Sequence, residues 1–573
     1  MYDSAGTADC LFSLSRSEWE AEHQSIPWTL DDSVTDEATE RWTCPHRVKA
    51  GEDRCIFHLS IDKKSAIETI DAFYTVVNEG SNRLNPTDSR RHKQFIGAVF
   101  PSLELPYAVL DAEDNYPIDL RHCHVNGPIN FHHGIIRHPV SLDGCVVTGQ
   151  LNCSHLQVEG DYIVLSDGRF ESGVKFDDAT LDNNLLAIQA QITGNLSCHN
   201  ARIGGHLELA GSTVAASNSE PGNLVLAKSD IGADAGLSRL ILDGQLLMGD
   251  GRFGGSVWLK WSKFKDNIHF RSVLFERDVR FEESAVEGVL SFFKSTFEGE
   301  IRITITELEA DTRAVDLREC RLNSGTLSQP SNPVIFDFRR AVVSDLEIDN
   351  PEGMDPFDYL YILQTRFDGF DFGNYTQELT RRDWKLHDLP PNTPAPEWND
   401  GELITQSPEN IENTYLKAKN GATEIGDNKA AARFFRREMI QRRAVHLARV
   451  RRTARDGRWK IAVKATGSAI GNFVLGAVTK HGEGSWRVVA ISIGIISAFV
   501  GIFAGLWGPN APPYGHPAGY LVLSLESFVT LVLGGSVPVR DPWWLRLVAN
   551  VEGFAGVFLV AVLVFTLTRS VHR

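Results

Sequence analysis

The chain has 573 residues and a formal net charge of −17 at pH 7, and this length suits several domains. A strongly acidic chain repels a phosphate backbone, so the charge argues against nucleic acid as a partner. An acidic solenoid that mimics DNA is the alternative left open. Carboxylates outnumber basic side chains by 74 to 57, a balance typical of proteins from a salt-loving microbe, a halophile.

Residues 1–40 are acidic and lack hydrophobic periodicity, so we expect a disordered acidic tail there. The start of the chain carries no apolar core of the kind that defines a signal peptide. The eight cysteines are scattered, and most fall within predicted strands. This pattern indicates reduced, buried thiols in a cytoplasmic domain rather than a framework of disulfides.

A candidate zinc knuckle follows, made of Cys44, His46, Cys55 and His58. Two thiolates and two imidazoles this close in sequence can form a tetrahedral site for a structural Zn²⁺. The Cys-x-His spacing of the first pair is tighter than the usual two-residue gap. The alternative is a pair of reduced cysteines beside surface histidines.

The rest of the segment 41–105 is predicted to be a helical cap. Apolar residues recur at helical spacing over 65–78, and a second helix is predicted over 87–100, after Pro86. Two helices here would cover the first edge of the domain that follows and keep it from pairing with other chains.

Residues 106–348 repeat with a period of 11. Pairs of apolar residues two positions apart start at Val140, Leu151, Ile163, Val174, Leu185, Leu196 and Leu207, and again at Val257, Ile268, Val279, Leu290 and Ile301. A fixed period of short strands and turns predicts a solenoid, and the alternation points both apolar residues inward. We therefore expect a right-handed parallel β-helix with about two 11-residue units per coil. The repeat resembles that of pentapeptide-repeat proteins, in a looser form.

The repeat region contains no set of acid, base and nucleophile, no phosphate-binding loop and no dinucleotide fingerprint. No catalytic residue is therefore expected, and the chain is not predicted to be an enzyme. Histidines cluster near the first coils, at His122, His124, His132, His133 and His138. They are interpreted either as exposed strand residues or as a metal or proton-sensing site. The ligand of the β-helix, a protein or a small molecule, is not identified by the sequence.

Residues 349–455 are predicted to form a helical linker ending in a hairpin. Helices are expected over 355–367, 376–387, 408–425 and 429–452, with a proline-rich stretch at 389–398. Ser407 and Pro408 form a typical helix start, and Asp427 follows Gly426 as the cap of the next helix. Arginines crowd the last helix, and anionic lipid is their expected partner.

Residues 456–573 are predicted to be a membrane domain. Two apolar stretches, 486–508 and 543–569, are long enough to cross a bilayer, and tryptophans lie at their ends as they do at interfaces. Residues 459–478 are interpreted as an interfacial helix rather than a third span. Between the spans, 517–539 is apolar but too short to cross and breaks at Gly534 and Gly535, which predicts a re-entrant pore loop.

This tail resembles the two-transmembrane, potassium-channel-like proteins. The segment 524–531 is similar to their pore helix, 536–538 to the exit of their filter, and 545–556 to the start of their inner helix. The resemblance implies a homotetramer around a path for a monovalent ion. The residues that correspond to the filter are Thr530, Leu531, Val532, Leu533, Gly534, Gly535 and Ser536, with Glu526, Glu552, Gly553 and Gly556 supporting the pore.

The filter departs from the family pattern Thr-Val-Gly-Tyr-Gly-Asp. Neither alignment of Thr530–Ser536 restores the stacked carbonyl rings that replace the hydration shell of potassium, so we expect a weakly selective ion channel. A different class of protein, a membrane-anchored interaction scaffold with a non-conducting, channel-like tail, is the alternative.

Charge also predicts the topology of the membrane domain. Ten arginines between 433 and 458 precede the first span, and Arg569 and Arg573 follow the second. Positive residues stay in the cytoplasm. We therefore expect a multi-pass protein of the plasma membrane with both termini cytoplasmic.

Overall fold

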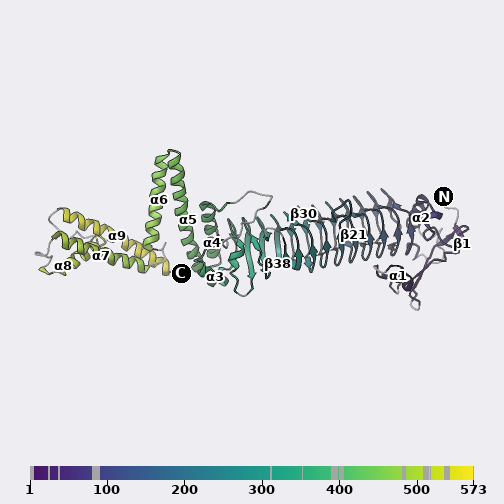
Figure 1. Ribbon diagram of the computed structural model, residues 1–573, viewed down its shortest axis with the longest axis horizontal. Coiled ribbons are helices and arrows are strands. Elements are labelled where there is room, and N and C mark those ends of the chain that lie inside the picture. The colour runs from purple at the N-terminus through teal and green to yellow at the C-terminus, as the bar shows by residue number, and fades with distance from the viewer. Residues whose placement is uncertain are drawn as a thin grey trace. The chain divides into compact units, whose positions relative to one another are not determined.

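The computed structural model divides the chain into two compact units, the first built mainly of strands and the second of helices (Figure 1). The first unit comprises Met1–Asp368 and Asp388–Glu402, and the second comprises Gly369–His387 and Leu403–Arg573. The residues that the structure describes are 5–23, 26–31, 33–36, 39–79, 91–309, 313–351, 353–388, 398, 405–479, 485–507, 515–516, 518–533 and 543–571.

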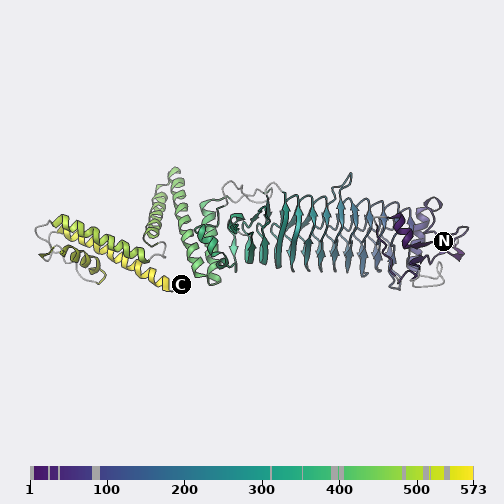
Figure 2. The ribbon, with the colours of Figure 1, turned by 60° about the horizontal axis from the view of Figure 1, so that its bottom comes forward.

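A parallel β-solenoid of about 12 turns makes up most of the first unit (Figure 2). Its strands run from β5 (Val99–Phe100) to β44 (Arg366–Phe367). One strand of each turn joins a 12-stranded sheet between β6 (Leu103–Glu104) and β43 (Leu360–Tyr361), and the remaining faces form a 28-stranded sheet. The predicted parallel solenoid is confirmed, and it extends beyond the predicted limits of 106 and 348 at both ends.

Each turn in the first part of the solenoid consists of four short strands and four corners. One turn contains β14 (Leu151–Asn152), β15 (Gln157–Val158), β16 (Tyr162–Val164) and β17 (Arg169–Phe170), and β18 (Val174–Lys175) then pairs with β14. Farther along, Leu246 pairs with Ile268 and Ile268 pairs with Leu290, so one turn there takes 22 residues. A turn therefore holds two of the predicted 11-residue units.

The same period appears in the backbone at the corners. A residue with positive φ recurs every 11 positions, at Asp167, Asp178, Gln189 and Asn200, and again at Lys228, Arg239, Asp250, Trp261, Ser272, Glu283 and Lys294. Aspartate and asparagine tolerate this left-handed conformation best, because their short polar side chains bond locally. The other residue types are held there by the strands on either side, which are tied to the turns before and after.

Apolar side chains fill the space inside the coils. Val257, Ile268, Val279 and Leu290 are completely buried, as the alternation predicts. Aromatic rings stack from turn to turn, with ring centroids 5.4 Å apart for Phe253 and Phe275 and 4.8 Å apart for Phe275 and Phe297. Each such pair adds to the stabilisation that comes from burial alone.

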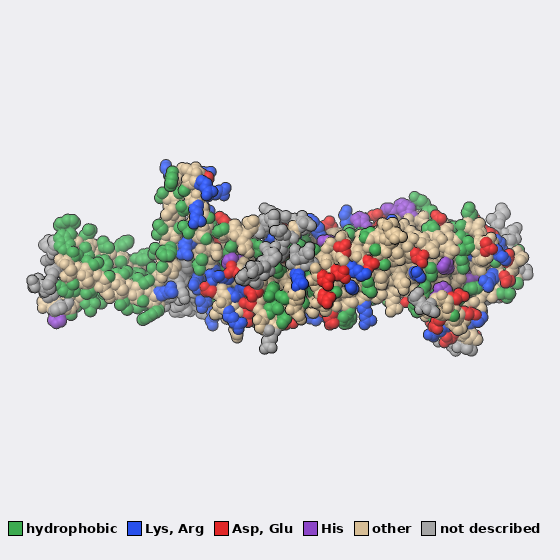
Figure 3. Space-filling model, in the orientation of Figure 1, with side chains coloured by type: hydrophobic (Ala, Val, Ile, Leu, Met, Phe, Trp, Pro, Cys, Tyr) green, Lys and Arg blue, Asp and Glu red, His purple; other side chains and the backbone are tan. Residues whose placement is uncertain are grey.

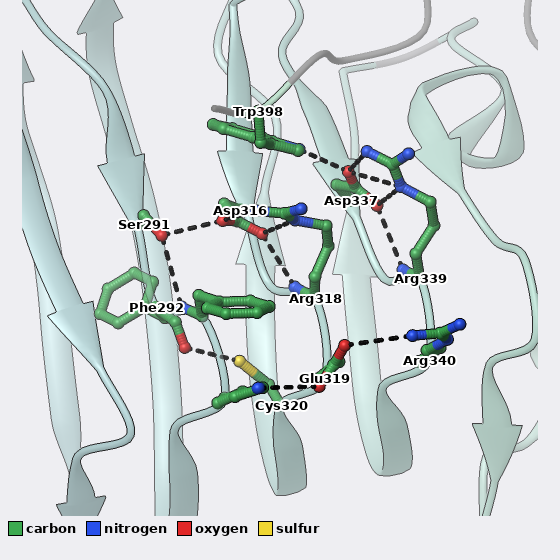
Figure 4. Close-up of polar contacts among 12 residues, drawn as sticks. Ser291, Phe292, Asp316, Arg318, Glu319, Cys320, Asp337, Arg339, Arg340 and Trp398 are labelled. Carbon is green, nitrogen blue, oxygen red and sulfur yellow. Dashed lines mark hydrogen bonds and ion pairs between the residues drawn. The ribbon is translucent and has the colours of Figure 1, made fainter. Parts of the chain in front are cut away.

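A buried polar ladder lies on the last turns of the solenoid (Figure 4). Arg318 pairs with Asp316 at 2.8 Å, and Arg339 pairs with Asp337 at 2.6 Å. In each pair the aspartate ends a strand and the arginine follows it by two residues. The indole of Trp398 donates a hydrogen bond of 2.7 Å to Asp337 and covers the guanidinium of Arg318 at 5.3 Å. Burial of these charges is tolerated because each is paired and hydrogen-bonded.

The predicted disordered tail is wrong for the described residues between 5 and 36. They include β1 (Ala5–Asp9), β2 (Ser13–Ser15) and α1 (Arg16–Glu22), whose first turn is closed by a capping box between Ser15 and Glu18. Trp19 and Ile26 pack against Val146 of the solenoid. Few apolar residues are present, but Trp19, Ile26 and Leu30 among them are buried, so this stretch is ordered by the solenoid rather than by its own periodicity.

Of the two helices predicted between residues 65 and 100, the described residues contain one. Helix α2 (Ala66–Glu79) is present, whereas the described residues from 91 to 100 form turns and β5 instead of the second predicted helix. Residues 80–90 lie outside the described part. The strand is favoured because Phe95, Ile96 and Phe100 are drawn into the first turns of the core, where all three are completely buried.

The helix predicted over 355–367 is also wrong. A short 3₁₀ helix, η3 (Pro356–Tyr359), leads into β43 and β44, which complete the last turn of the solenoid. Phe357, Leu363 and Phe367 are buried there. Short apolar runs fit a helix or a strand equally well, and pairing with the preceding turn decides for the strand.

The second unit is helical. It contains α3 (Thr376–Arg381), shorter than the predicted 376–387, then α4 (Pro408–Glu424), α5 (Asn428–Arg455), α6 (Trp459–Thr479), α7 (Ser485–Trp507), α8 (Gly519–Thr530) and α9 (Trp543–Val571). Ser407 and Asp427 cap α4 and α5 as predicted. The proline-rich stretch lies outside the described residues except for Trp398. Helices α6, α7 and α9 are long and apolar enough to cross a membrane.

Candidate functional site

Four buried side chains near the N-terminus can hold a metal ion. They are Cys10, Cys44, Cys55 and His58, and one ligand atom from each lies within 4.8 Å of the others. The sulfurs of Cys44 and Cys55 are 3.7 Å apart. In a tetrahedral zinc site with Zn–S bonds of about 2.3 Å, two sulfurs are separated by about 3.8 Å. The spacing of these thiols therefore fits zinc.

Two strand pairings bring these residues together. Cys10 follows β1, which pairs with β4 (Arg47–Lys49), and its amide donates a 2.9 Å hydrogen bond to the carbonyl of His46. Cys44 follows β3 (Arg41–Thr43), which pairs with β2. The tight turn over 55–58 then supplies Cys55 and His58. The site thus joins a segment from the start of the chain to the cap of the solenoid.

The ring of His58 is fixed by its surroundings. Its Nε2 donates a 2.9 Å hydrogen bond to the carbonyl of Ile96, which leaves Nδ1 facing the thiol of Cys55 at 3.1 Å. The ring also stacks on Phe12 with centroids 4.0 Å apart. Such second bonds orient histidine ligands and set their tautomer. His58 is therefore presented to the thiols through one defined nitrogen.

Three of the four predicted ligands lie in this group, and the fourth, His46, does not. The Nε2 of His46 is bonded to the carbonyl of His92 at 2.8 Å, and its Nδ1 is 3.5 Å from the sulfur of Cys44. Cys10 takes the place that the sequence gives to His46. It was missed because it lies outside the local cluster of cysteines and histidines and enters through a strand pairing.

The electrostatics of the group favour a thiolate. Burial opposes ionisation, but hydrogen bonds with Cys10 and Cys44 and the charge of His58 hold the pKa of Cys55 well below its usual range. Burial lowers the pKa of His58, and the Cys55 thiolate more than offsets this and raises it to about 9. The pKa of Cys44 is raised by burial. The surroundings therefore favour the thiolate form of Cys55, and a divalent cation would favour ionisation of the other thiols.

A second candidate site is the group of three helices at the C-terminus. Phe503 of α7, Leu523 of α8 and Leu545 of α9 share one apolar cluster, and Val488, Phe528 and Leu559 from the same three helices share another. The order of these contacts makes α8 antiparallel to α7 and parallel to α9. With 12 residues, α8 is about 18 Å long, too short for a hydrocarbon core of about 30 Å.

Two glycines of α9 let the backbone of α8 approach closely. A Cβ atom at Gly553 would lie 2.9 Å from the carbonyl oxygen of Ser527, and one at Gly556 would collide with that of Phe528. One residue before this face, the buried carboxylate of Glu552 accepts a hydrogen bond from the hydroxyl of Ser524. Both predicted glycines and Glu552 therefore contact α8, in the same order along the two helices.

The other residues predicted to form or support the pore lie elsewhere on α8 or beyond it. Glu526 is exposed on α8, and its carbonyl accepts the hydroxyl of Thr530. Leu531, Val532 and Leu533 follow the helix and are exposed in the single chain. Gly534, Gly535 and Ser536 lie outside the described residues.

The architecture thus defines a class: a parallel β-solenoid followed by a helical region with three apolar helices, each long enough to span a membrane. Comparisons with protein-family models, with curated proteins and with solved structures found no match.

Proposed function

We propose that this chain is the subunit of an oligomeric ion channel of the two-transmembrane, re-entrant-pore-loop type. In this proposal α7 and α9 cross the membrane, α8 is the half-length pore helix, and the β-solenoid is a cytoplasmic sensor or scaffold. The solenoid would receive a protein or small-molecule ligand and transmit its state through α4 and α5.

The observation that carries the proposal is the parallel packing of α8 on α9. Ser524 meets Glu552 and Phe528 meets Gly556, so both helices advance together along four residues. Two consecutive parallel helices require the chain to return along the length of the first before the second begins. Within a membrane such a return is tolerated only where it lines water or is buried in protein, which is the condition of a pore loop.

A pore of this kind needs several subunits, and the resemblance implies four. Thr530, Leu531, Val532 and Leu533 would meet their symmetry mates around the axis, followed by Gly534, Gly535 and Ser536. The permeating species would be a monovalent ion with weak selectivity, because the filter lacks the potassium pattern. The protein would be multi-pass in the plasma membrane with both termini cytoplasmic, a compartment that suits its eight free, buried cysteines.

Single-channel recording on the purified, full-length protein in planar bilayers tests the proposal, with sodium and potassium exchanged across the membrane. Gly556→Val should abolish current, because its side chain displaces α8. Gly501→Val is the matched control, since a Cβ at Gly501 of α7 meets nothing within 4 Å. Absence of current from folded wild-type oligomers would instead favour a membrane-anchored scaffold with a non-conducting tail.

We also propose that Cys10, Cys44, Cys55 and His58 bind a structural Zn²⁺. The donor set of three thiols and one imidazole is a common one for structural zinc, and all four side chains are buried. Lys64 is buried nearby, where its ammonium donates to the carbonyls of Ile56 and Phe57 at 2.8 and 3.0 Å. Its positive charge would balance a zinc ion held by three thiolates. Metal analysis should find one zinc per chain.

A further inference from the structure

The pairing of charges changes halfway along α5. In the first half, Arg437 pairs with Asp383 at 2.5 Å, and Arg442 pairs with Glu412 and Glu438 at 2.7 Å each. Beyond Arg442 the exposed cations of α5, α6 and the turn between them are Arg449, Arg451, Arg452, Arg455, Arg458, Lys460 and Lys464. Among the residues that the structure describes, the one carboxylate paired with any of these seven is Asp456, at 3.7 Å from Arg458.

Helix α6 packs along α5 through its small side chains and leaves its large ones outside. Ala462, Ala465 and Ala469 recur at helical spacing and are buried. The contact continues at Phe473, which lies 5.5 Å from the guanidinium of Arg443 of α5. Several large apolar side chains of α6 remain exposed; Trp459, Val463 and Ile470 lie on one flank of this contact, and Ile461 lies on the other.

This packing decides how α6 can meet a membrane. By length and composition α6 is a candidate span, but a helix with as many unpaired arginines as the second half of α5 is excluded from hydrocarbon. While α6 is packed on α5, it is therefore kept out of the bilayer core as well. An exposed apolar face beside a row of cations suits the headgroup boundary instead.

We infer that the α5–α6 hairpin is a surface clamp for anionic phospholipids. The arginines of α5 bind headgroup phosphates while the apolar face of α6 lies at the level of the upper acyl chains. Figure 3 shows basic side chains gathered on this hairpin and hydrophobic side chains covering α7–α9. Because α7 begins six residues after the end of α6, the clamp is tethered beside a candidate span. It rests on the membrane insertion of α7 and α9 in the proposed function, but not on conduction.

Lipid binding by the full-length protein tests the clamp. The protein is purified in detergent with mixed phosphatidylglycerol and phosphatidylcholine, and bound lipid is counted by native mass spectrometry. Near an anionic surface each basic residue contributes roughly fivefold in binding, so Arg451→Gln/Arg455→Gln should weaken phosphatidylglycerol binding roughly 25-fold. The control, Arg202→Gln/Arg321→Gln, removes two exposed arginines of the solenoid and should bind as the wild type does. Equal binding by the clamp variant would overturn the inference.

The depth of α6 gives a second measurement. Val463→Cys places a label on the exposed face of α6, and the natural cysteines of the chain are buried, so a nitroxide reagent reports one site in nanodiscs. The clamp predicts a label just below the headgroups, at the level of the upper acyl chains. A label at the bilayer centre would show that α6 is a third span and would refute the inference. Neither measurement uses channel current. A protein that conducts no ions would therefore refute the channel proposal without contradicting the lipid-binding inference.

Discussion

Replacing Cys10 with alanine should separate the metal site that the structure forms from the one that the sequence predicts. The structure places the sulfur of Cys10 with those of Cys44 and Cys55 and with His58, and it directs His46 to the carbonyl of His92. Cys10→Ala should therefore weaken zinc binding strongly, whereas His46→Ala should leave the ligands intact.

The expected loss follows from the number of ligands. A structural zinc site contributes roughly 10–16 kcal/mol of binding free energy at pH 7. Shared among four ligands, this is about 3 kcal/mol for each, or roughly a hundredfold in the dissociation constant. The loss should also release the N-terminal segment, because Cys10 lies directly after β1 and the metal would hold that strand to the cap.

Competition with a chromophoric zinc chelator measures the dissociation constant of zinc for the full-length protein and for each variant. Mass spectrometry counts the bound zinc. His46→Ala is the matched control: it removes a hydrogen bond and the stacking of His46 on Phe95, with centroids 5.3 Å apart. It should cost about 1–3 kcal/mol of stability and retain one zinc per chain. Zinc retained by Cys10→Ala and lost by His46→Ala would refute the assignment of ligands.

Two further predictions concern the solenoid. Trp398→Ala removes the hydrogen bond to Asp337 and the ring that covers Arg318. The free energy of unfolding should therefore fall by about 1–3 kcal/mol, and Trp398→Phe should recover part of this loss. An unchanged melting temperature of Trp398→Ala would contradict the prediction. Burial raises the pKa of Asp143 to about 7, above its unfolded value, so its stabilisation is present at acid pH and declines as the pH rises through 7. Asp143→Asn should therefore be more stable than the wild type at pH 8, by about 4 kcal/mol at most, and melts from pH 5 to 8 that stay parallel would count against it.

The solenoid was predictable because its information is local and repeated. An apolar pair at Val257, Ile268 or Val279 is a weak signal alone, but the fixed period multiplies it. The same period sets the corners with positive φ, at Asp250 and Trp261 for example, although residue type alone would not place a tryptophan there. The coil closes after two periods because each turn must lie in register on the one before.

The errors fall where the structure depends on distant pairings. Residues 91–100 and 355–367 have apolar spacings that fit a helix, yet both add strands to the ends of the solenoid. Cys10 shows the same limit at the metal site, because nothing near it in the sequence marks it as a ligand. In each case a contact with a segment already folded outweighs the local pattern.

The glycines of α9 show how a local signal can carry a functional argument. Gly553 and Gly556 leave no room for a side chain beneath the carbonyls of Ser527 and Phe528, and Glu552 binds Ser524 one turn earlier on α8. These contacts act together. A shift of α8 away from the glycines would also separate Ser524 from the carboxylate of Glu552, which would then lie unpaired in an apolar environment. The penalty for an unpaired buried carboxylate is steep. The short helix is thereby held in one position against α9, and a fixed half-helix is what a pore loop requires of its support.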